Sequence, residues 1–240
     1  MRGWTRKCAA AALLVAGGGP GCTRLSGGDP SGRDAAGGAD LAAVRGEDLS
    51  ASLADLGPAG PWSRDWSSHP AVYTKSGAAR VWGLSDVHAD RDRLVTLLAG
   101  ATLVAGSAAA PVWTGGTDIL VVCGDSIDKG TQSIEVLDYW MSLVPQAEAA
   151  GGEVVVLVGN HEVEFLADPL NSKAAALDSE ITGESPLMFA SVDDPHGRFL
   201  HERPIAALVD GWFFSHAGNS GGMSANSIGA KYRALVDQGI

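Results

Sequence analysis

Residues 119–130 read ILVVCGDSIDKG, an apolar run that passes through a glycine into two acidic side chains. Residues 80–88, RVWGLSDVH, and 154–162, VVVLVGNHE, have the same layout. Short β-branched runs bounded by glycine or polar residues are typical of strands buried on both faces of a sheet. Loops at the strand ends of an open α/β sheet converge on one place, so we expect the polar residues of all three segments to form one site.

The rest of the body alternates between strand-like and helix-like patterns. Strands are predicted at residues 71–74, 80–84, 119–123, 154–158 and 212–215. Helix-spaced apolar residues predict helices at 90–98 and 133–144, the second ended by Pro145 and the Gly151-Gly152 pair. This alternation indicates right-handed βαβ crossovers and an α/β fold with a largely parallel sheet core. The long interval between Asn160 and His216 predicts an insertion or cap.

Composition limits the class of protein. With 240 residues and 45% apolar content, the chain can form one domain with appendages. Its net charge of −11, from 17 basic and 28 acidic residues, excludes a nucleic-acid scaffold, because such a protein needs a basic face. Bound metal cations would neutralise part of the negative charge.

The N-terminus has the layout of an export signal. Arg2, Arg6 and Lys7 precede the apolar run 8–16, and small residues follow as far as Cys22. We therefore expect residues 1–22 to be a signal peptide and the protein to be extracytoplasmic, either periplasmic or a membrane-anchored lipoprotein. Lipid attachment at Cys22, ordinary cleavage nearby and a retained anchor all stay open, and a lipid is the expected membrane contact.

Residues 23–61 are rich in Gly, Ala, Ser and Asp and show no sustained period. Such a segment cannot bury enough apolar surface to offset its ordering entropy, so we expect a disordered tether with a short helix within 40–56. The folded domain is expected to span 62–240. Without the leader, Cys123 is the sole cysteine and is expected to be a buried small hydrophobe.

The strand ends carry side chains that suit metal cations. Asp86 and His88 lie two apart just beyond a strand, where a turning backbone can bring both to one cation. Asp125 offers two oxygens and can bridge two cations. A pair of cations roughly 3.5 to 4 Å apart would hold a water as hydroxide and clamp phosphoryl oxygens during in-line displacement. This chemistry suits hydrolysis of a phosphate ester.

Other polar residues complete this hypothesis. Asn160 is expected to supply a neutral oxygen ligand to the second metal and to contact substrate phosphate, and His216 is expected to supply a nitrogen ligand. Adjacent residues do not easily bind one ion together, so His161 is expected to be the acid that protonates the leaving oxygen. Asp128 can orient that imidazole and raise its basicity. Lys129 would be a point-charge contact to phosphate.

Simpler roles are expected for several polar residues. Asp90 opens a predicted helix and is expected to cap it. Glu162 is expected to have a structural role rather than to bind a metal. His69, His196 and His201 lie in polar segments flanked by Pro or Gly and are expected to be surface or packing residues. A single aspartate at a strand end is usually a turn residue. Three such motifs, each after a strand-like segment, occur together by chance much less often than one does, which favours a shared functional site.

The order of the four motifs resembles that of the calcineurin-like metallophosphoesterases, and within them the phosphoprotein phosphatase branch. The resemblance spans about 81–218 and includes Gly124-Asp125, Gly159-Asn160-His161-Glu162 and Ser215-His216-Ala217-Gly218. The segments 113–117 and 197–204 are similar to those of the Shewanella-like protein phosphatases.

The resemblance implies a β-sandwich flanked by helices, in four layers α/β/β/α. It implies phosphate monoester hydrolysis, on a phosphorylated protein or a small phosphoester, with two divalent or trivalent ions that are Mn, Fe or Zn. It assigns the ligands of the first ion as Asp86, His88 and Asp125, and those of the second as Asp125, Asn160 and His216. It makes His161 the general acid and Asp128 its partner.

The chain also departs from the family pattern. Ser85 and Ala89 stand where the family usually has Gly, and Lys129 replaces an Arg, which removes a planar bidentate contact to phosphate. The family places a further metal-binding His and a phosphate-binding Arg beyond the His216 motif, and no histidine follows His216 here. We therefore expect a C-terminally incomplete sequence; if it is complete, the second metal site lacks one ligand.

Two alternatives stay open. The same motifs serve phosphodiesterases and dinucleoside polyphosphate hydrolases such as diadenosine tetraphosphatases. A degenerate, non-catalytic member of the fold would keep the motifs and bind metal poorly. The sequence does not determine whether the substrate carries phosphoserine, phosphothreonine or phosphotyrosine. It also does not determine the metal or the oligomeric state.

Overall fold

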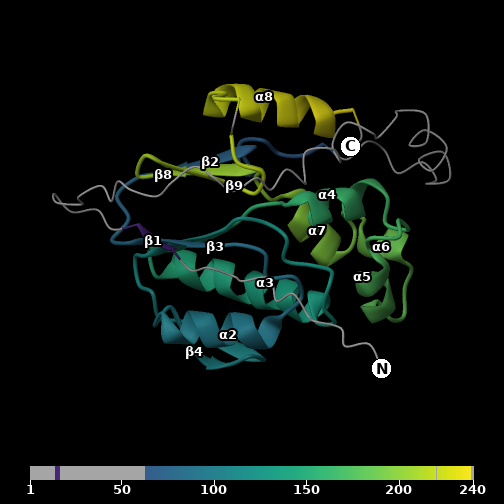
Figure 1. Ribbon diagram of the computed structural model, residues 1–240, viewed down its shortest axis with the longest axis horizontal. Helices are drawn as coiled ribbons and strands as arrows, with labels where there is room; N and C mark the ends of the chain where they lie inside the picture. The colour runs from purple at the N-terminus through teal and green to yellow at the C-terminus, as the bar shows by residue number, and fades with distance from the viewer. Residues whose placement is uncertain (1–13, 17–62, 220, 239–240) are drawn as a thin grey trace, which may run out of the picture. The chain divides into compact units, whose positions relative to one another are not determined.

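The computed structural model describes residues 14–16, 63–219 and 221–238 (Figure 1). The predicted tether, Cys22 and the short helix expected within 40–56 lie outside the described residues. So does the predicted leader, apart from the strand at Leu14–Ala16, and the leader stays a prediction. None of the helices in the described part of the chain combines the length and the hydropathy that a membrane span requires.

The main sheet has four strands in the order β1-β3-β6-β7. Its members are β1 (Leu14–Ala16), β3 (Val81–Leu84), β6 (Ile119–Val122) and β7 (Glu153–Val156). The strands β3, β6 and β7 are parallel, as predicted, and β1 pairs antiparallel with β3. The crossovers between the parallel strands contain α2 (Arg91–Gly100) and α3 (Ser133–Ala149).

Alternate residues of the parallel strands enter two different cores, which explains why these strands are apolar apart from Glu153 at the start of β7. Val81, Val121 and Val155 face the second sheet and share a core with Ala207 and Val209 of that sheet. The residues between them face α2 and α3 and join the larger core. That set includes Trp82, Leu84, Leu120, Val122, Val154 and Val156. Each fully buried Val or Leu stabilises the fold by about 1.5–3 kcal/mol.

The second sheet has three strands in the order β2-β8-β9: β2 (Val72–Lys75), β8 (Ala206–Val209) and β9 (Trp212–Ser215). The helix α8 (Ala225–Val236) covers its other face and packs on β2 through Gly229, which is buried beside Val72. Figure 1 shows the resulting order of layers: α8, the second sheet, the main sheet, then α3 and α2. The predicted four-layer α/β/β/α fold is confirmed.

The sequence patterns missed three β elements, and one of them is β1, in the apolar run that was assigned to a leader. Strand β8 contains the weak strand formers Ala206 and Ala207, and its partners β2 and β9 supply the pairing. The hairpin of β4 (Val104–Ser107) and β5 (Ala110–Trp113) is rich in Ala, Gly and Ser, so it carries little of the β-branched signal.

The predicted end of the second helix at Pro145 was wrong, whereas the predicted Gly151-Gly152 pair does follow its C-cap, Ala150. Helix α3 continues through Pro145 to Ala149, although proline cannot donate the backbone hydrogen bond that a helix needs. Leu143 and Ala147, on either side of Pro145, are fully buried in the larger core. Packing against the sheet therefore outweighs the one lost hydrogen bond.

The predicted insertion between Asn160 and His216 is present. It comprises α4 (Asn160–Ala167), α5 (Ala175–Glu180), α6 (Pro186–Phe189) and α7 (Pro195–His201), followed by β8. The turn after α7 is fixed by Arg64, which is 4% exposed. The guanidinium of Arg64 donates to the backbone carbonyl oxygens of five residues: His69, Pro70, His201, Glu202 and Arg203.

Candidate metal centre

The three predicted motif loops meet because the parallel strands end level with one another. Leu84 lies beside Val122 in the register, and Val122 lies beside Val156. Beyond the strands the loops bind one another directly: the backbone N–H of His88 donates to the carbonyl of Asp125 at 2.9 Å. The site therefore stands on the rigid end of the main sheet rather than on an independent loop.

Six residues of these loops that are not glycine have left-handed backbone angles. They are Asp86, His88, Ala89, Asp125, Asp128 and Lys129, with φ between 46° and 64°. This conformation costs about 1–2 kcal/mol for an ordinary residue, and it is enriched at functional sites when the surroundings enforce it. The motif glycines provide the required room: a Cβ on Gly124 would collide with the backbone of Gly159, and one on Gly130 with the carbonyl oxygens of His88 and Ala89.

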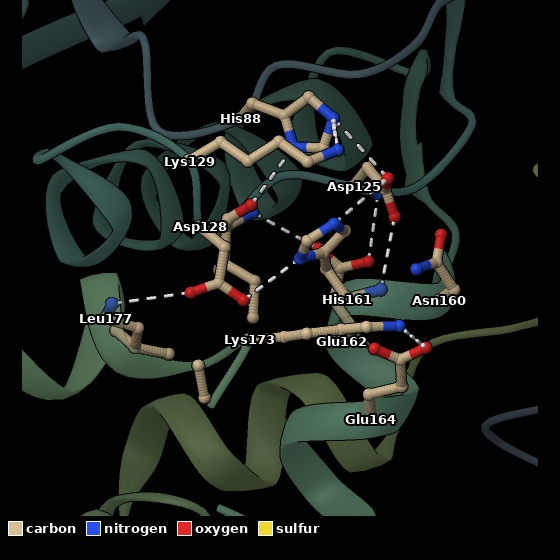
Figure 2. Close-up of polar contacts among 12 residues, drawn as sticks. His88, Asp125, Asp128, Lys129, Asn160, His161, Glu162, Glu164, Lys173 and Leu177 are labelled. Atoms are coloured by element: carbon tan, nitrogen blue, oxygen red, sulfur yellow. Dashed lines mark hydrogen bonds and ion pairs between the residues drawn. The ribbon is translucent and has the colours of Figure 1, made fainter. Parts of the chain in front are cut away.

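One cluster at this end of the sheet contains His88, Asp125 and His161, all three buried. The Nε2 of His88 lies 3.5 Å from Asp125 Oδ2, and the Nε2 of His161 lies 4.0 Å from the same oxygen. Figure 2 shows both imidazoles directed toward the Asp125 carboxylate. The Nδ1 of His88 is 3.3 Å from the carbonyl oxygen of Ile127, so Nε2 is the nitrogen that faces the centre.

A second cluster contains Asp86, Asp125 and His216. The Nε2 of His216 lies 3.4 Å from Asp125 Oδ1 and 3.1 Å from the side-chain oxygen of Asn160. Its Nδ1 is 2.9 Å from the carbonyl oxygen of Cys123. Asp86 Oδ1 is 3.5 Å from His88 Nε2, which joins the two clusters. Each oxygen of Asp125 therefore faces a different group of donors.

His161 is held through its other nitrogen. Its Nδ1 lies 3.1 Å from Asp128 Oδ2, and both side chains are buried (Figure 2). This hydrogen bond raises the pKa of His161 above the ordinary value, because it favours the protonated ring. His161 can therefore carry a proton on Nε2 at the edge of the centre. The same orientation would also let Nε2 bind a cation.

Glu162 has the structural role expected from the sequence. Its carboxylate, 1% exposed, accepts hydrogen bonds from the backbone N–H groups of Asp125, Ser126, Ile127 and Gly159. Burial raises the pKa of Glu162, and the N–H donors oppose that shift. The Glu162 side chain thus joins the loop that carries Asp125 to the loop that carries Gly159.

Lys129 is exposed at the rim, and its Nζ lies 3.0 Å from His88 Nε2. Burial lowers the pKa of His88, and the Lys129 cation acts in the same direction. Neutral imidazole is the form that binds a metal. The position of the Nζ also places a positive charge within reach of an anion at the centre.

The donors present fit two cations. Two carboxylates, two or three imidazole nitrogens and an amide oxygen lie together, and in each cluster the ligand atoms of its three members are within 4.8 Å of one another. Mixed nitrogen and oxygen ligands suit Mn, Fe and Zn. Asp125, whose side chain is 3% exposed, is a member of both clusters.

Several other sequence expectations are confirmed. Asp90 caps α2 by accepting from the Arg93 N–H at 3.1 Å. His196 stacks on Phe189 with ring centroids 4.8 Å apart, and His201 is held by a backbone carbonyl oxygen. Cys123 was expected to be buried but is only half-buried. It packs against the core between the sheets, and burial raises the pKa of its thiol to about 11.

The sequence reasoning did not find the residues that surround Asp128. The N–H of Leu177 donates to Asp128 Oδ1 at 3.3 Å, and the N–H of Asp128 donates to Ser133 Oγ at 3.3 Å. Ser133 in turn donates to Glu180 at 2.8 Å. Leu177 and Glu180 belong to α5, and no local pattern relates α5 to Asp128.

Comparison with known proteins agrees with this geometry. The profile of the calcineurin-like phosphoesterase family matches residues 79–235. Shewanella-like protein phosphatase 2 of Arabidopsis thaliana is 32% identical over 84 residues, which are 35% of this chain and 21% of the relative. Shewanella-like protein phosphatase 1 of Plasmodium berghei is 23% identical over 166 residues, 66% of this chain and 45% of the relative.

A solved structure is similar as well. The cold-active protein-tyrosine phosphatase of a psychrophilic Shewanella species superposes with a TM-score of 0.58 and 30% identity, over 70% of this chain and 51% of that one. The chain thus spans less than half the length of these two curated relatives and about half of the solved one. The family profile covers most of the folded domain and all four motifs, and the chain belongs to the calcineurin-like phosphoesterase family.

Proposed function

We propose that this chain is a metal-dependent phosphomonoesterase that acts on a phosphorylated protein. The observation that carries the proposal is the shared position of Asp125, which faces one donor cluster with each oxygen while His161 stands beside it, bound to Asp128. The names of the relatives support a phosphoprotein substrate, since they are called protein phosphatases.

The residues divide into binding and proton-transfer roles. Asp86, His88 and Asp125 would hold one ion, and Asp125, Asn160 and His216 the other. When bound, the two ions would supply Lewis acidity and an activated water for in-line displacement at phosphorus. Lys129 would contact a phosphate oxygen with its amino group, and Asn160 would do so through its side-chain amide.

His161 would donate the proton that the leaving oxygen needs. The charge on that oxygen grows as its bond to phosphorus breaks, so a positioned acid is most valuable when the leaving alcohol is weakly acidic. Asp128 keeps Nδ1 occupied, so the proton available for transfer is the one on Nε2. Its raised pKa keeps the ring protonated over a wider range of pH.

The first test is turnover of a chromogenic aryl phosphate by the full chain, as stripped apoprotein and with manganese added, with bound metal measured per chain. Metal-restored turnover with two ions per chain is the expected result. Bis-aryl phosphate and dinucleoside polyphosphate substrates, assayed in parallel, test the diesterase and nucleotide alternatives. One ion or none, without turnover, would identify a non-catalytic member of the fold.

We also propose an exported protein with a leader at residues 1–22, which includes β1, so that cleavage would remove this strand from the main sheet. Support comes from the basic residues followed by the apolar run and by Cys22. Mass spectrometry of the N-terminus, after expression in an exporting host, would distinguish a lipid on Cys22 from ordinary cleavage and from a retained leader.

A further inference from the structure

We propose that Glu180 is a positioning residue for proton transfer, acting through Ser133 and Asp128 on His161. This inference rests on the proposed function, because it assigns a role in the proton-transfer step. It begins with α3, whose first turn follows the Asp128 loop directly and whose N-cap residue, Gln132, makes no side-chain cap hydrogen bond.

Glu180 supplies that cap from a distant part of the chain. Its Oε2 accepts from the N–H of Ile134 at 3.1 Å, and its Oε1 accepts from the hydroxyl of Ser133 at 2.8 Å. A carboxylate at a helix N-terminus satisfies unpaired N–H groups and is favoured by their partial positive charge. Both oxygens are therefore occupied at the point where α3 begins.

Ser133 transmits this contact to the Asp128 loop. Its side chain is fully buried, and its oxygen accepts from the backbone N–H of Asp128 at 3.3 Å while its hydrogen goes to Glu180. Asp128 has a left-handed backbone with φ of 64°, so its loop needs external support. The hydrogen bond from Ser133 to Glu180 fixes the direction of the serine lone pairs that receive that N–H.

The same helix, α5, also holds the side chain of Asp128. The N–H of Leu177 donates to Oδ1 at 3.3 Å, which leaves Oδ2 for His161 Nδ1 at 3.1 Å, as Figure 2 shows. Glu180 lies at the end of α5, and its two contacts with α3 keep α5 against the Asp128 loop. Backbone and side chain of Asp128 thus depend on one short helix.

The orientation of His161 follows from this arrangement. A rotation of the Asp128 carboxylate would move the acceptor of the Nδ1 hydrogen and would turn the imidazole, so Nε2 would no longer face the leaving oxygen. Misplacement of a catalytic group by about 1 Å can cost about 10²-fold in rate. Glu180 does not contact the donor clusters, so its loss should leave metal binding intact.

The experiment compares Glu180→Gln with Glu184→Gln. Glu184 is exposed in the segment just after α5, and it provides the same change of charge outside the network. Turnover is measured on an aryl and an alkyl phosphate monoester, and bound metal is measured in each variant. We expect Glu180→Gln to raise the aryl-to-alkyl rate ratio about ten-fold with full metal content, while Glu184→Gln leaves the ratio unchanged.

A second variant separates positioning from damage to the fold. Ser133→Ala should produce the same change of ratio, and the double variant should add little to either single change, because both act along one path. An equal fall of both rates in Glu180→Gln, with an unchanged ratio, would show a structural role alone and overturn the inference. Strict additivity of the two changes would also count against it.

The proposed function and this inference fail in different ways. If His161→Asn alters the ratio and Glu180→Gln does not, only the role of Glu180 is wrong. If the wild-type chain has no phosphatase activity, the proposed function and the role of Glu180 in positioning His161 for proton transfer are both wrong. Amide hydrogen exchange of α5 in the apoprotein then tests separately whether Glu180 holds α5 against the Asp128 loop. Faster exchange at Leu177 in Glu180→Gln is expected, and unchanged exchange would show that Glu180 does not hold α5 in place.

Discussion

The two halves of the centre differ in how firmly the protein holds them. In the buried half, formed by His88, Asp125 and His161, each side chain is 9% exposed or less. In the open half, formed by Asp86, Asp125 and His216, the Asp86 side chain is 43% exposed and that of His216 is 19% exposed. Asp125 belongs to both.

The partners of the two halves differ as well. His161 is hydrogen-bonded to the Asp128 carboxylate. That carboxylate also accepts from the N–H of Leu177 in α5, and the backbone N–H of Asp128 binds Ser133, which is bound to Glu180 of α5. His216 contacts Cys123 and Asn160, and Asp86 contacts Ser85 beside it and His88. Contacts within the protein therefore hold the His161 side more firmly than the open side. Four experiments test this difference.

The largest effect is expected from Asp125→Asn, because Asp125 is common to both halves. The change removes the bridging negative charge, so both ions should be lost and turnover should fall by about 10³-fold. Metal analysis and initial rates measure this, with Asp193→Asn, an exposed aspartate, as the matched control. Retention of two ions by Asp125→Asn would show that the halves do not share this residue as a bridge.

His161→Asn tests the buried half alone. Two ions should remain, and turnover should fall by about 10²-fold on an alkyl ester and much less on an aryl ester, because only proton delivery is lost. The comparison uses paired substrates and His69→Asn as the control. Equal losses on both esters would count against the acid role, and loss of an ion would make His161 a ligand.

His216→Ala tests the open half. We expect the affinity for the ion proposed at Asp125, Asn160 and His216 to fall by about 10–100-fold. The ion proposed at Asp86, His88 and Asp125 should stay bound, because its ligands are untouched. Metal titration followed by calorimetry measures the two affinities separately. If both ions are lost together, the halves are coupled more strongly than their separate burial indicates.

The smallest effect is the pH dependence of stability in the stripped apoprotein. The pKa of His161 is raised above 6.5, so its contribution is complete below pH 6.5 and is lost as the pH rises through the raised value. The pKa of His88 is lowered, so its contribution is present above pH 6.5 and is lost as the pH falls through the lowered value. The free energy of unfolding, measured with urea at several pH values, should therefore fall as the pH rises through the pKa of His161 and rise as the pH rises through the pKa of His88. His161→Asn should remove the first slope, and His88→Asn should remove the second. Two slopes of the same sign would contradict the assignment of the two environments.

The sequence identified the parts of this centre that depend on strand ends. Residues 119–122, 81–84 and 154–156 are apolar because each strand is buried on two faces, and that pattern is visible locally. Since the carboxyl ends of parallel strands lie at one edge, the convergence of Asp86, Asp125 and Asn160 could be predicted without coordinates. Further contacts of the centre depend on the path of a long insertion, which has no such period.

Tertiary structure alone decided three features. Helix α3 passes through Pro145 because burial on either side exceeds the cost of one missing hydrogen bond. Strand β8 forms from Ala-rich sequence because β2 and β9 supply its partners. Glu180 reaches the Asp128 loop because α5 folds back on α3, although 52 positions of sequence separate Glu180 from Asp128. Sequence periodicity reports which face of an element is buried, and contacts between distant elements form only when those faces pack.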